Sequence, residues 1–318
     1  MQCTLSRLPS TKQKSGEGRV ERRDGLFRSG PAIPEVIMEE KKMKRLRSGV
    51  LFLALILMCS LSAAADPQRT ETDGIVAAIR EHGVLRVGTA GDYMPMSCLD
   101  PDTNRYVGFD AELAEDLAAS LDVKIEYVPT SWPTLMEDTL AGKFDLAICG
   151  ITITEARKEQ ALMSDGYLGN GKTVLCRAED AGKFLSLEAI NQPEVRVMEN
   201  PGGLNEKFAR ENLPNAMLII HDVNQEIPGL VADKKADVMI TEIMEAGYYA
   251  GQDSRLAAPL IREPFTNGQL GVLMPKGNEE LLEYVNEFLR LEKDSGRIDE
   301  LAEKYIYQTV EEEMADAA

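Results

Sequence analysis

Short apolar runs and helical patterns alternate along the first half of the chain beyond residue 84. Runs rich in β-forming residues at 85–89, 123–128 and 144–148 predict strands. Apolar residues at helical spacing predict helices over 110–121, with Asp110 as the N-cap, and over 134–140. Strands that alternate with helices in this way are typical of a mostly parallel α/β sheet.

A second alternating set follows residue 176. The predicted strands are 195–198, 217–220, 238–241 and 269–274, and the predicted helices are 205–211, 226–232, 242–249, 278–291 and 296–305. Two α/β units of similar build, without a long Pro- or Ser-rich linker, predict two lobes joined by strands. A ligand cleft is expected between the lobes.

The N-terminal part has the pattern of an export signal. Basic residues gather at 41–47, an uncharged apolar run covers 49–61, and small residues follow at Ala63–Ala65. The alternative is a membrane anchor, but the 13 residues of the apolar run fall short of the roughly 20 that span a bilayer. We expect residues 1–37 to be a non-native or disordered leader, residues 38–65 to be a signal peptide cleaved after Ala65, and the mature protein to be periplasmic.

The N-terminal part, residues 1–65, and the rest of the chain differ in the sign of their net charge. The chain of 318 residues has a net charge of -18, yet residues 1–65 carry 12 Lys plus Arg against 6 Asp plus Glu. Residues 66–318 carry 23 against 47, so the expected mature protein is strongly acidic. Nucleic acids and anionic lipid surfaces both require clustered basic residues, so these partners are disfavoured.

The cysteines and histidines are too few and too scattered for a metal or disulfide framework. Cys98, Cys149 and Cys176 are the only cysteines after residue 65, and His82 and His221 are isolated. We expect the three thiols to be small buried residues and the protein to need no cofactor or metal.

Residues 166–173 match the phosphate-binding pattern G-x-x-x-x-G-K-[ST]. That loop requires a buried strand before it and a helix after it. Here no apolar strand precedes the glycines and a strand pattern, 173–176, follows them, so nucleotide binding is not expected. Lys172 remains as a cation presented by a glycine-rich turn where the lobes join.

Two segments suit a ligand carboxylate. Residues 200–205 join a strand to a helix through two glycines, and exposed backbone N–H groups at a helix N-terminus favour an anion. The alternative is an ordinary helix start with Asn205 as its N-cap. Thr152 and Arg157 follow the strand at 144–148, and Arg binds carboxylates through two parallel hydrogen bonds. The alternative for Arg157 is a solvated surface side chain.

Two carboxylates follow the strand at 238–241. Glu242 and Glu245 stand three residues apart on the predicted helix and can share one face. In a closed cleft such a pair raises the pKa of one member, as a general acid requires, whereas on an open surface both are simply solvated. Trp132, the only tryptophan, lies in a strand-to-helix loop, where it can stack on a ring or wedge the loop against its own lobe.

Residues 85–305 resemble the bacterial periplasmic solute-binding proteins, family 3, that serve amino-acid ABC transporters. The segments that carry this likeness are LRVGTAGDYMP, YVGFDAELAEDLA, KFDLAICGITITEARKEQ and KKADVMITE. Within that superfamily the chain is most similar to the cyclohexadienyl dehydratases, through PTSWPTLM, NGKT, QPEVRVMENPGGLNEKFA and ADVMITEIMEA. The resemblance implies the two-lobed type II binding-protein fold, with lobe 1 formed by residues 66–175 and 266–318 and lobe 2 by residues 176–265.

The same resemblance implies an activity. Cyclohexadienyl dehydratases are lyases of phenylalanine biosynthesis that convert prephenate to phenylpyruvate, or arogenate to phenylalanine. Glu245 falls on their general acid and Lys172 on their lysine beside the reacting groups. Residues at further cleft positions of the family are implied to bind the substrate; they are Asp92, Trp132, Thr152, Arg157, Asn200, Asn205 and Glu242.

Some positions depart from the dehydratase pattern. Glu242 stands where Asp is usual, Leu204 replaces a Thr, and NGKTVL differs from DGKTPI. The alternative to an enzyme is therefore a non-catalytic binding protein that delivers an amino acid or related carboxylate to an ABC permease.

Overall fold

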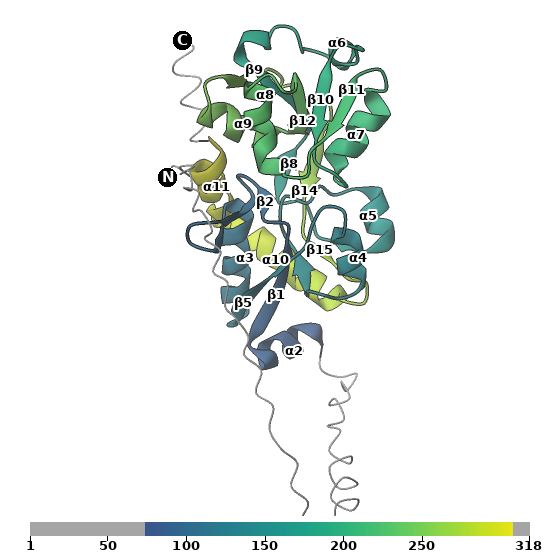
Figure 1. The fold of residues 1–318 in the computed structure, drawn as a ribbon. Coiled ribbons are helices and arrows are strands. Elements are labelled where there is room, and N and C mark those ends of the chain that lie inside the picture. The colour runs from purple at the N-terminus through teal and green to yellow at the C-terminus, as the bar shows by residue number, and fades with distance from the viewer. Residues whose placement is uncertain (1–73, 308–318) are drawn as a thin grey trace, which may run out of the picture. The chain divides into compact units, whose positions relative to one another are not determined.

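The computed structural model describes residues 74–307. The expected leader and signal peptide lie outside these residues. Within them no helix is long and apolar enough to cross a membrane. Two five-stranded sheets, each flanked by helices, form two lobes (Figure 1).

The first lobe is built on a sheet that combines early and late segments of the chain. Its strand order is β5 (Lys124–Pro129), β1 (Val84–Thr89), β6 (Leu146–Ala147), β15 (Leu273–Met274) and β7 (Leu162–Met163). The first three strands are parallel, and β15 is antiparallel to β6 and β7. The helices of this part are α2 (Ile75–His82), α3 (Phe109–Ser120), α4 (Leu135–Leu140), α5 (Glu155–Gln160), α10 (Glu279–Asp294) and α11 (Arg297–Ala302), followed by a π-helical turn at Glu303–Tyr307.

The second lobe has the strand order β11 (Met217–Ile220), β10 (Arg196–Glu199), β12 (Val238–Glu242), β9 (Lys172–Arg177) and β13 (Leu256–Ala257). Its first three strands are parallel and the last two run antiparallel to their neighbours. The helical segments are η1 (Ala178–Asp180), α6 (Leu187–Ile190), α7 (Leu204–Asn212), η2 (Asn224–Glu226), α8 (Ile227–Ala232) and α9 (Ile243–Gln252).

Two antiparallel strands, β8 (Leu168–Asn170) and β14 (Gly268–Leu270), run between the lobes (Figure 1). The expected lobe boundary after residue 175 falls inside β9, all of whose residues belong to the second sheet. A strand, not a helix, therefore follows the glycines of 166–171. The phosphate-loop geometry that the sequence argued against is absent from this segment.

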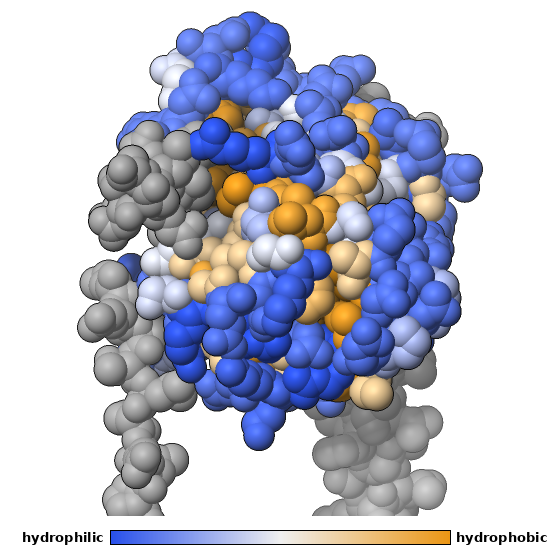
Figure 2. Space-filling model, turned by 90° about the horizontal axis from the view of Figure 1, so that it is seen from above, coloured by the Kyte–Doolittle hydropathy of each residue, from blue (hydrophilic) through white to orange (hydrophobic). Residues whose placement is uncertain are grey.

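Each lobe has a core of buried apolar side chains, and Met244 of α9 in the second lobe packs into the core of the first. In the first lobe, Leu85 and Val87 of β1 pack with Leu113 of α3 and Val285 of α10, so α10 completes a core begun 200 residues earlier in the chain. In the second lobe the central strands β9 and β12 are buried along their whole length, as expected for strands covered by helices on both faces. Figure 2 shows a mostly hydrophilic outer surface with a band of hydrophobic residues across the face seen from above.

The start of α3 differs from the expectation. Asp110 is not the N-cap: Gly108 is, with φ at +122°, and a Cβ there would lie 2.6 Å from the carbonyl oxygens of Pro95 and Met96. Asp110 instead turns inward, where its carboxylate accepts hydrogen bonds from the Tyr167 hydroxyl, at 2.7 Å, and from the backbone N–H of Gly150. Burial raises the pKa of Asp110 to about 7.

A small three-stranded sheet places residues of the first lobe next to the second lobe. Its strands are β2 (Asp92–Tyr93), β3 (Ser97–Asp100) and β4 (Arg105–Val107). The strand expected over 144–148 is shorter than predicted, since only Leu146–Ala147 pair as β6. The chain therefore leaves the sheet early and presents Gly150 and Thr152 to the cleft.

Candidate active site

A cavity lies between the C-terminal ends of the strands of the two lobes. Its volume is about 20 Å³, which is room for about one or two water molecules. Its lining residues are Tyr93, Trp132, Gly150, Thr152, Arg157, Asn200, Gly203, Leu204, Asn205, Asn224, Glu242 and Glu245. Pockets that hold small organic ligands measure about 300–1,000 Å³, so a ligand larger than water requires the lobes to move apart.

Glu245 lies in the first turn of α9 and is completely buried. One carboxyl oxygen accepts a hydrogen bond from Asn224 Nδ2 at 2.8 Å, and the other is bonded to the Thr241 hydroxyl. Burial raises the pKa of Glu245 to about 8; the negative charge of Glu242 adds to the increase, and the hydrogen bond from Thr241 opposes it. The group is therefore a protonated carboxylic acid at neutral pH.

Glu242 is the last residue of β12 and not part of the following helix, contrary to the sequence-based expectation of one shared helical face. Its Oε1 forms a buried ion pair with Lys172 Nζ, and Lys172 is its register partner on β9. Lys172 Nζ also donates a hydrogen bond to Asn205 Oδ1. The Tyr93 hydroxyl donates to Glu242 Oε2 at 3.0 Å. Both oxygens of Glu242 are thus occupied.

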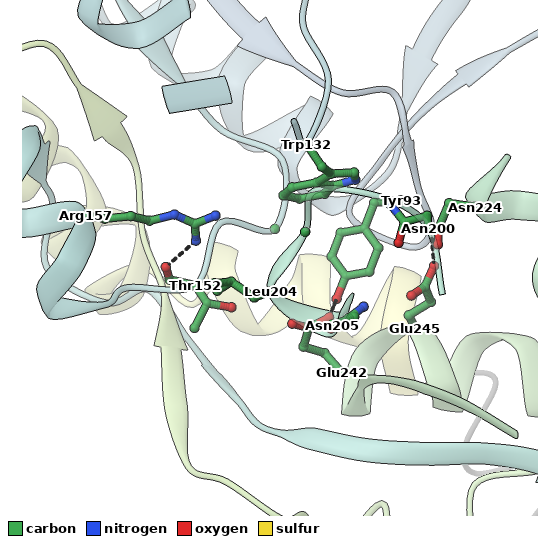
Figure 3. A pocket seen from close by; sticks show the side chains of 12 residues that line it. Tyr93, Trp132, Thr152, Arg157, Asn200, Leu204, Asn205, Asn224, Glu242 and Glu245 are labelled. Atoms are coloured by element: carbon green, nitrogen blue, oxygen red, sulfur yellow. Dashed lines mark hydrogen bonds between the residues drawn. The ribbon is translucent and has the colours of Figure 1, made fainter. Parts of the chain in front are cut away.

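Arg157 stands in α5 at the opposite end of the cavity from Asn224 and Glu245 (Figure 3). Its Nη1 donates to the backbone carbonyl of Thr152 at 2.6 Å, which fixes the guanidinium beside the strand end. Burial lowers the pKa of Arg157, yet an arginine in this setting keeps its charge. The guanidinium is therefore a half-buried cation that lines the cavity, not a fully solvated surface side chain.

Trp132 covers the cavity from the first lobe (Figure 3). Its Nε1 donates to Asp92 Oδ1 at 3.0 Å, and its ring meets that of Tyr93 edge to face, with 5.9 Å between centroids. Asp92 does not line the cavity but orients Trp132 from behind. Burial raises the pKa of Asp92.

The turn before α7 supplies Asn200 and Gly203 to the cavity, and the first turn of α7 supplies Leu204 and Asn205. Helix α7 begins at Leu204 with Gly203 as N-cap, so Asn205 is a first-turn residue and not the cap. Its side chain is free to bind Lys172. The backbone N–H groups of this turn were expected to bind an anion. One of them, that of Gly202, already donates a hydrogen bond to Glu206 Oε2 at 2.6 Å.

Within residues 74–307, hydrogen bonds join the lobes across the cleft. Besides the bond from Tyr93 to Glu242, Asn224 Nδ2 donates to the carbonyl of Asp92 at 3.2 Å and Gln225 Nε2 lies 3.0 Å from Cys98 Sγ. Asn224 and Gln225 belong to η2 of the second lobe, whereas Asp92 and Cys98 belong to the first. The cleft is therefore held nearly closed by polar contacts.

The model of the bacterial extracellular solute-binding proteins, family 3, matches residues 85–308. The chain belongs to this family. Its mixed sheets and two-lobed build are those of a type II periplasmic binding protein. The family is one of extracellular proteins, in agreement with the expected export.

Named relatives of this solute-binding protein include both an enzyme and transport proteins. The chain is 38% identical over 266 residues to cyclohexadienyl dehydratase of Pseudomonas aeruginosa, covering 84% of this chain and 96% of that one. It is 26% identical to the L-cystine-binding protein TcyJ of Escherichia coli, covering 81% and 93%. An ancestral amino acid-binding protein, AncCDT-1, described as a precursor of cyclohexadienyl dehydratase, matches with a TM-score of 0.67 and 38% identity, covering 73% of this chain and 99% of that one.

The sequence-predicted site residues of this family member meet in one place. Seven of them line the cavity, namely Trp132, Thr152, Arg157, Asn200, Asn205, Glu242 and Glu245. Lys172 and Asp92 lie just behind them, each bonded to a lining residue. Among residues 74–307 no group of three or more His, Cys, Asp or Glu is arranged to hold a metal ion.

Five cavity residues were not predicted as site residues, and two of them, Tyr93 and Asn224, form hydrogen bonds between the lobes. Tyr93 lies in a segment whose Gly and Pro indicated only a turn, and Asn224 lies in a polar stretch between a strand and a helix. The alternation of buried and exposed positions gives no signal for either residue. Only the approach of η2 to β2, which comes from residues far apart in the sequence, brings them together.

Proposed function

We propose that this protein is an exported cyclohexadienyl dehydratase, a carbon–oxygen lyase that converts prephenate to phenylpyruvate, or arogenate to phenylalanine. The observation that carries the proposal is the buried Glu245, a carboxylic acid with a pKa of about 8 in a cleft that also contains Arg157 and Lys172. The 38% identity to the dehydratase of Pseudomonas aeruginosa supports it. Membership of a family of extracellular proteins supports a periplasmic location, and we propose cleavage after Ala65 from the small residues that precede it.

The reaction needs an acid because the leaving group is a hydroxyl. Glu245 gives its proton to the ring hydroxyl, the carbon–oxygen bond breaks, and water leaves. The bond from the opposite ring carbon to its carboxylate breaks at the same time, CO₂ leaves, and the electron pair of that bond completes the aromatic ring. Solvent then returns a proton to Glu245. A protonated acid at neutral pH contributes about 10²–10⁴-fold to such a step.

The cations bind the two carboxylates of the substrate in this proposal. Arg157 holds one of them through the part of its guanidinium that Thr152 does not use. Lys172 stands near the carboxylate that is lost, and Trp132 covers the ring. Since the cavity is only about 20 Å³, substrate enters an opened cleft, and closure then excludes water from the reacting groups.

The decisive experiment incubates the purified protein with prephenate and follows phenylpyruvate formation by its absorbance in alkali. Turnover well above the spontaneous rate is expected, and Glu245→Gln should remove nearly all of it. Glu211→Gln makes the same chemical change on an exposed position of α7 and should leave the rate unchanged. Failure of the wild-type protein to exceed the buffer blank would refute the proposal.

The second candidate is a non-catalytic binding protein that delivers an amino acid or related carboxylate to an ABC permease. The names of the relatives favour it, because they include proteins that bind L-cystine, glutamine and arginine. This candidate predicts that an amino acid raises the melting temperature of the protein and is recovered unchanged, because a ligand that binds only the native state stabilises it.

A further inference from the structure

Among residues 74–307, one cavity-lining side chain has a buried polar atom without a hydrogen-bond partner. The buried side-chain atoms that lack a partner in this part of the chain are Asn170 Oδ1, Thr173 Oγ1, Glu199 Oε2 and Asn224 Oδ1. Of these four residues, Asn224 is the one that lines the cavity, and its exposed fraction is 3%. A buried acceptor without a partner costs free energy, which a ligand that donates to Asn224 Oδ1 recovers.

The first lobe sets the orientation of the Asn224 amide. Its nitrogen donates to the backbone carbonyl of Asp92 at 3.2 Å, and a carbonyl only accepts, so Nδ2 and not Oδ1 must be on this side. The same nitrogen donates to Glu245 Oε1 at 2.8 Å. In the closed cleft Oδ1 is therefore left as an acceptor beside the carboxyl group of Glu245.

Glu245 has a donor to offer at the same place. Its Oε1 accepts from Asn224, and its Oε2 is bonded to the Thr241 hydroxyl. The oxygen of a protonated carboxyl that carries the proton can also accept a hydrogen bond. Oε2 can thus keep its bond with Thr241 and still give its own proton to a ligand. The acid and the amide together present one donor and one acceptor.

A hydroxyl group matches this pair, because a single oxygen atom both donates and accepts. An ammonium group only donates, and a carboxylate only accepts. Arg157, at the opposite end of the cavity, presents a cation instead (Figure 3). The two ends of the cavity therefore differ in the ligand group that they suit, a carboxylate at Arg157 and a hydroxyl at Asn224 and Glu245.

We propose that Asn224 Oδ1 accepts a hydrogen bond from the ligand hydroxyl and that Asn224 is a catalytic residue of the dehydration. The catalytic part rests on the proposed dehydratase function. The ring hydroxyl donates to Oδ1, which turns its lone pair toward Glu245. Glu245 protonates that oxygen, the carbon–oxygen bond breaks as CO₂ leaves, and water departs with its original hydrogen still on Asn224. Since the oxygen becomes more positive as it gains the proton, the hydrogen bond to the amide strengthens in the transition state.

The test compares two acids that differ only in the ring hydroxyl and that the proposed reaction does not consume. In 4-hydroxyphenylpyruvate the hydroxyl is on the ring carbon opposite the side chain, whereas phenylpyruvate has hydrogen there. Each acid is titrated calorimetrically into the purified protein. We expect 4-hydroxyphenylpyruvate to bind about 5- to 10-fold more tightly, the equivalent of one net hydrogen bond.

Asn224→Ala should make the two affinities nearly equal. A purely structural role of Asn224 in closing the cleft would weaken both acids by the same factor and keep their ratio. Gln225→Ala is the matched control, because this neighbour on η2 also contacts the first lobe, at Cys98 Sγ. It should keep the wild-type ratio. Asn224→Ser serves as the second variant if the alanine variant does not fold.

The outcomes separate the two proposals. If the wild-type protein does not convert prephenate, the dehydratase proposal fails, and the titrations still decide whether Asn224 binds a hydroxyl. If prephenate is converted, Asn224→Ala should lower kcat about tenfold, and an unchanged kcat overturns the catalytic role. A wild-type protein that binds phenylpyruvate as tightly as the hydroxy acid, or that binds neither, overturns the proposal. An unchanged ratio in a folded Asn224 variant overturns it as well.

Discussion

The hydroxyl of Tyr93 donates a hydrogen bond of 3.0 Å to Oε2 of Glu242, from the first lobe to the second. The Tyr93 ring is buried and packs edge to face on Trp132. This contact links the closed arrangement of the lobes to the carboxylate that holds Lys172, so closure and the electrostatics of the cleft are not independent.

Tyr93→Phe keeps the ring and removes the hydroxyl. We expect kcat/KM for prephenate to fall about 10- to 100-fold, because a hydrogen bond to a charged group contributes about 1.5–3 kcal/mol. The melting temperature should change little, since the packing on Trp132 remains. Tyr248→Phe, on α9, is the matched control. A variant with wild-type kcat/KM would show that the cross-cleft bond does not contribute to catalysis.

The pKa of Glu245 sets an upper pH limit for activity. The acid acts in its protonated form, and its pKa is raised to about 8, so kcat/KM should be level near pH 7 and decline tenfold per pH unit well above pH 8. A pH–rate profile from pH 5 to 10 measures this. An activity that rises through pH 8 would be incompatible with Glu245 as general acid.

Arg157 can be tested with substitutions that differ in charge and shape. Arg157→Lys keeps the charge but loses the planar fork, and we expect KM for prephenate to rise about 10- to 100-fold, the equivalent of a charge-assisted hydrogen bond. Arg157→Met should raise KM further. Arg290→Lys, at an exposed position of α10, is the control. An unchanged KM in Arg157→Met would remove Arg157 from the binding site.

Asp110 makes stability depend on pH. Its pKa is about 7 in the folded protein against an ordinary value of 3.8, so the folded state holds a proton that the unfolded state releases. Stability from this group is therefore full below about pH 4 and is lost as the pH rises to about 7. Asp110→Asn should reduce the decline in melting temperature between pH 4 and 7.5. Asp102→Asn, on an exposed loop, should not.

Sequence patterns located most elements of the fold and most of the site. Strand 217–220 was predicted to the residue, because Met-Leu-Ile-Ile is a short run of apolar and β-branched residues, although both of its end residues are exposed. Glu242 was assigned to the wrong element. Strand β12 ends at Glu242 and helix α9 begins at Ile243. A glutamate at this position is compatible with the sequence pattern of a strand end and with that of a helix start, so the pattern did not assign it correctly.

Contacts between residues that lie far apart in the sequence could not be predicted from the local hydrophobic pattern. Asp110 looks like a helix cap in sequence, but Gly108 takes that position because its backbone passes close to Pro95 and Met96. The pairing of Asn224 with Glu245 and Asp92 likewise depends on how the lobes meet. Local periodicity describes which face of an element is buried, not what it is buried against.

The position of the only tryptophan has a practical consequence. Trp132 covers the cavity, and its indole nitrogen is bonded to Asp92 while its ring contacts Tyr93. Opening of the cleft or entry of a ligand changes the polarity around this one chromophore, and no second indole contributes background emission. The intrinsic fluorescence of the unlabelled protein is thus a direct optical signal of events in the cleft, suited to stopped-flow measurement of how fast ligands enter and leave.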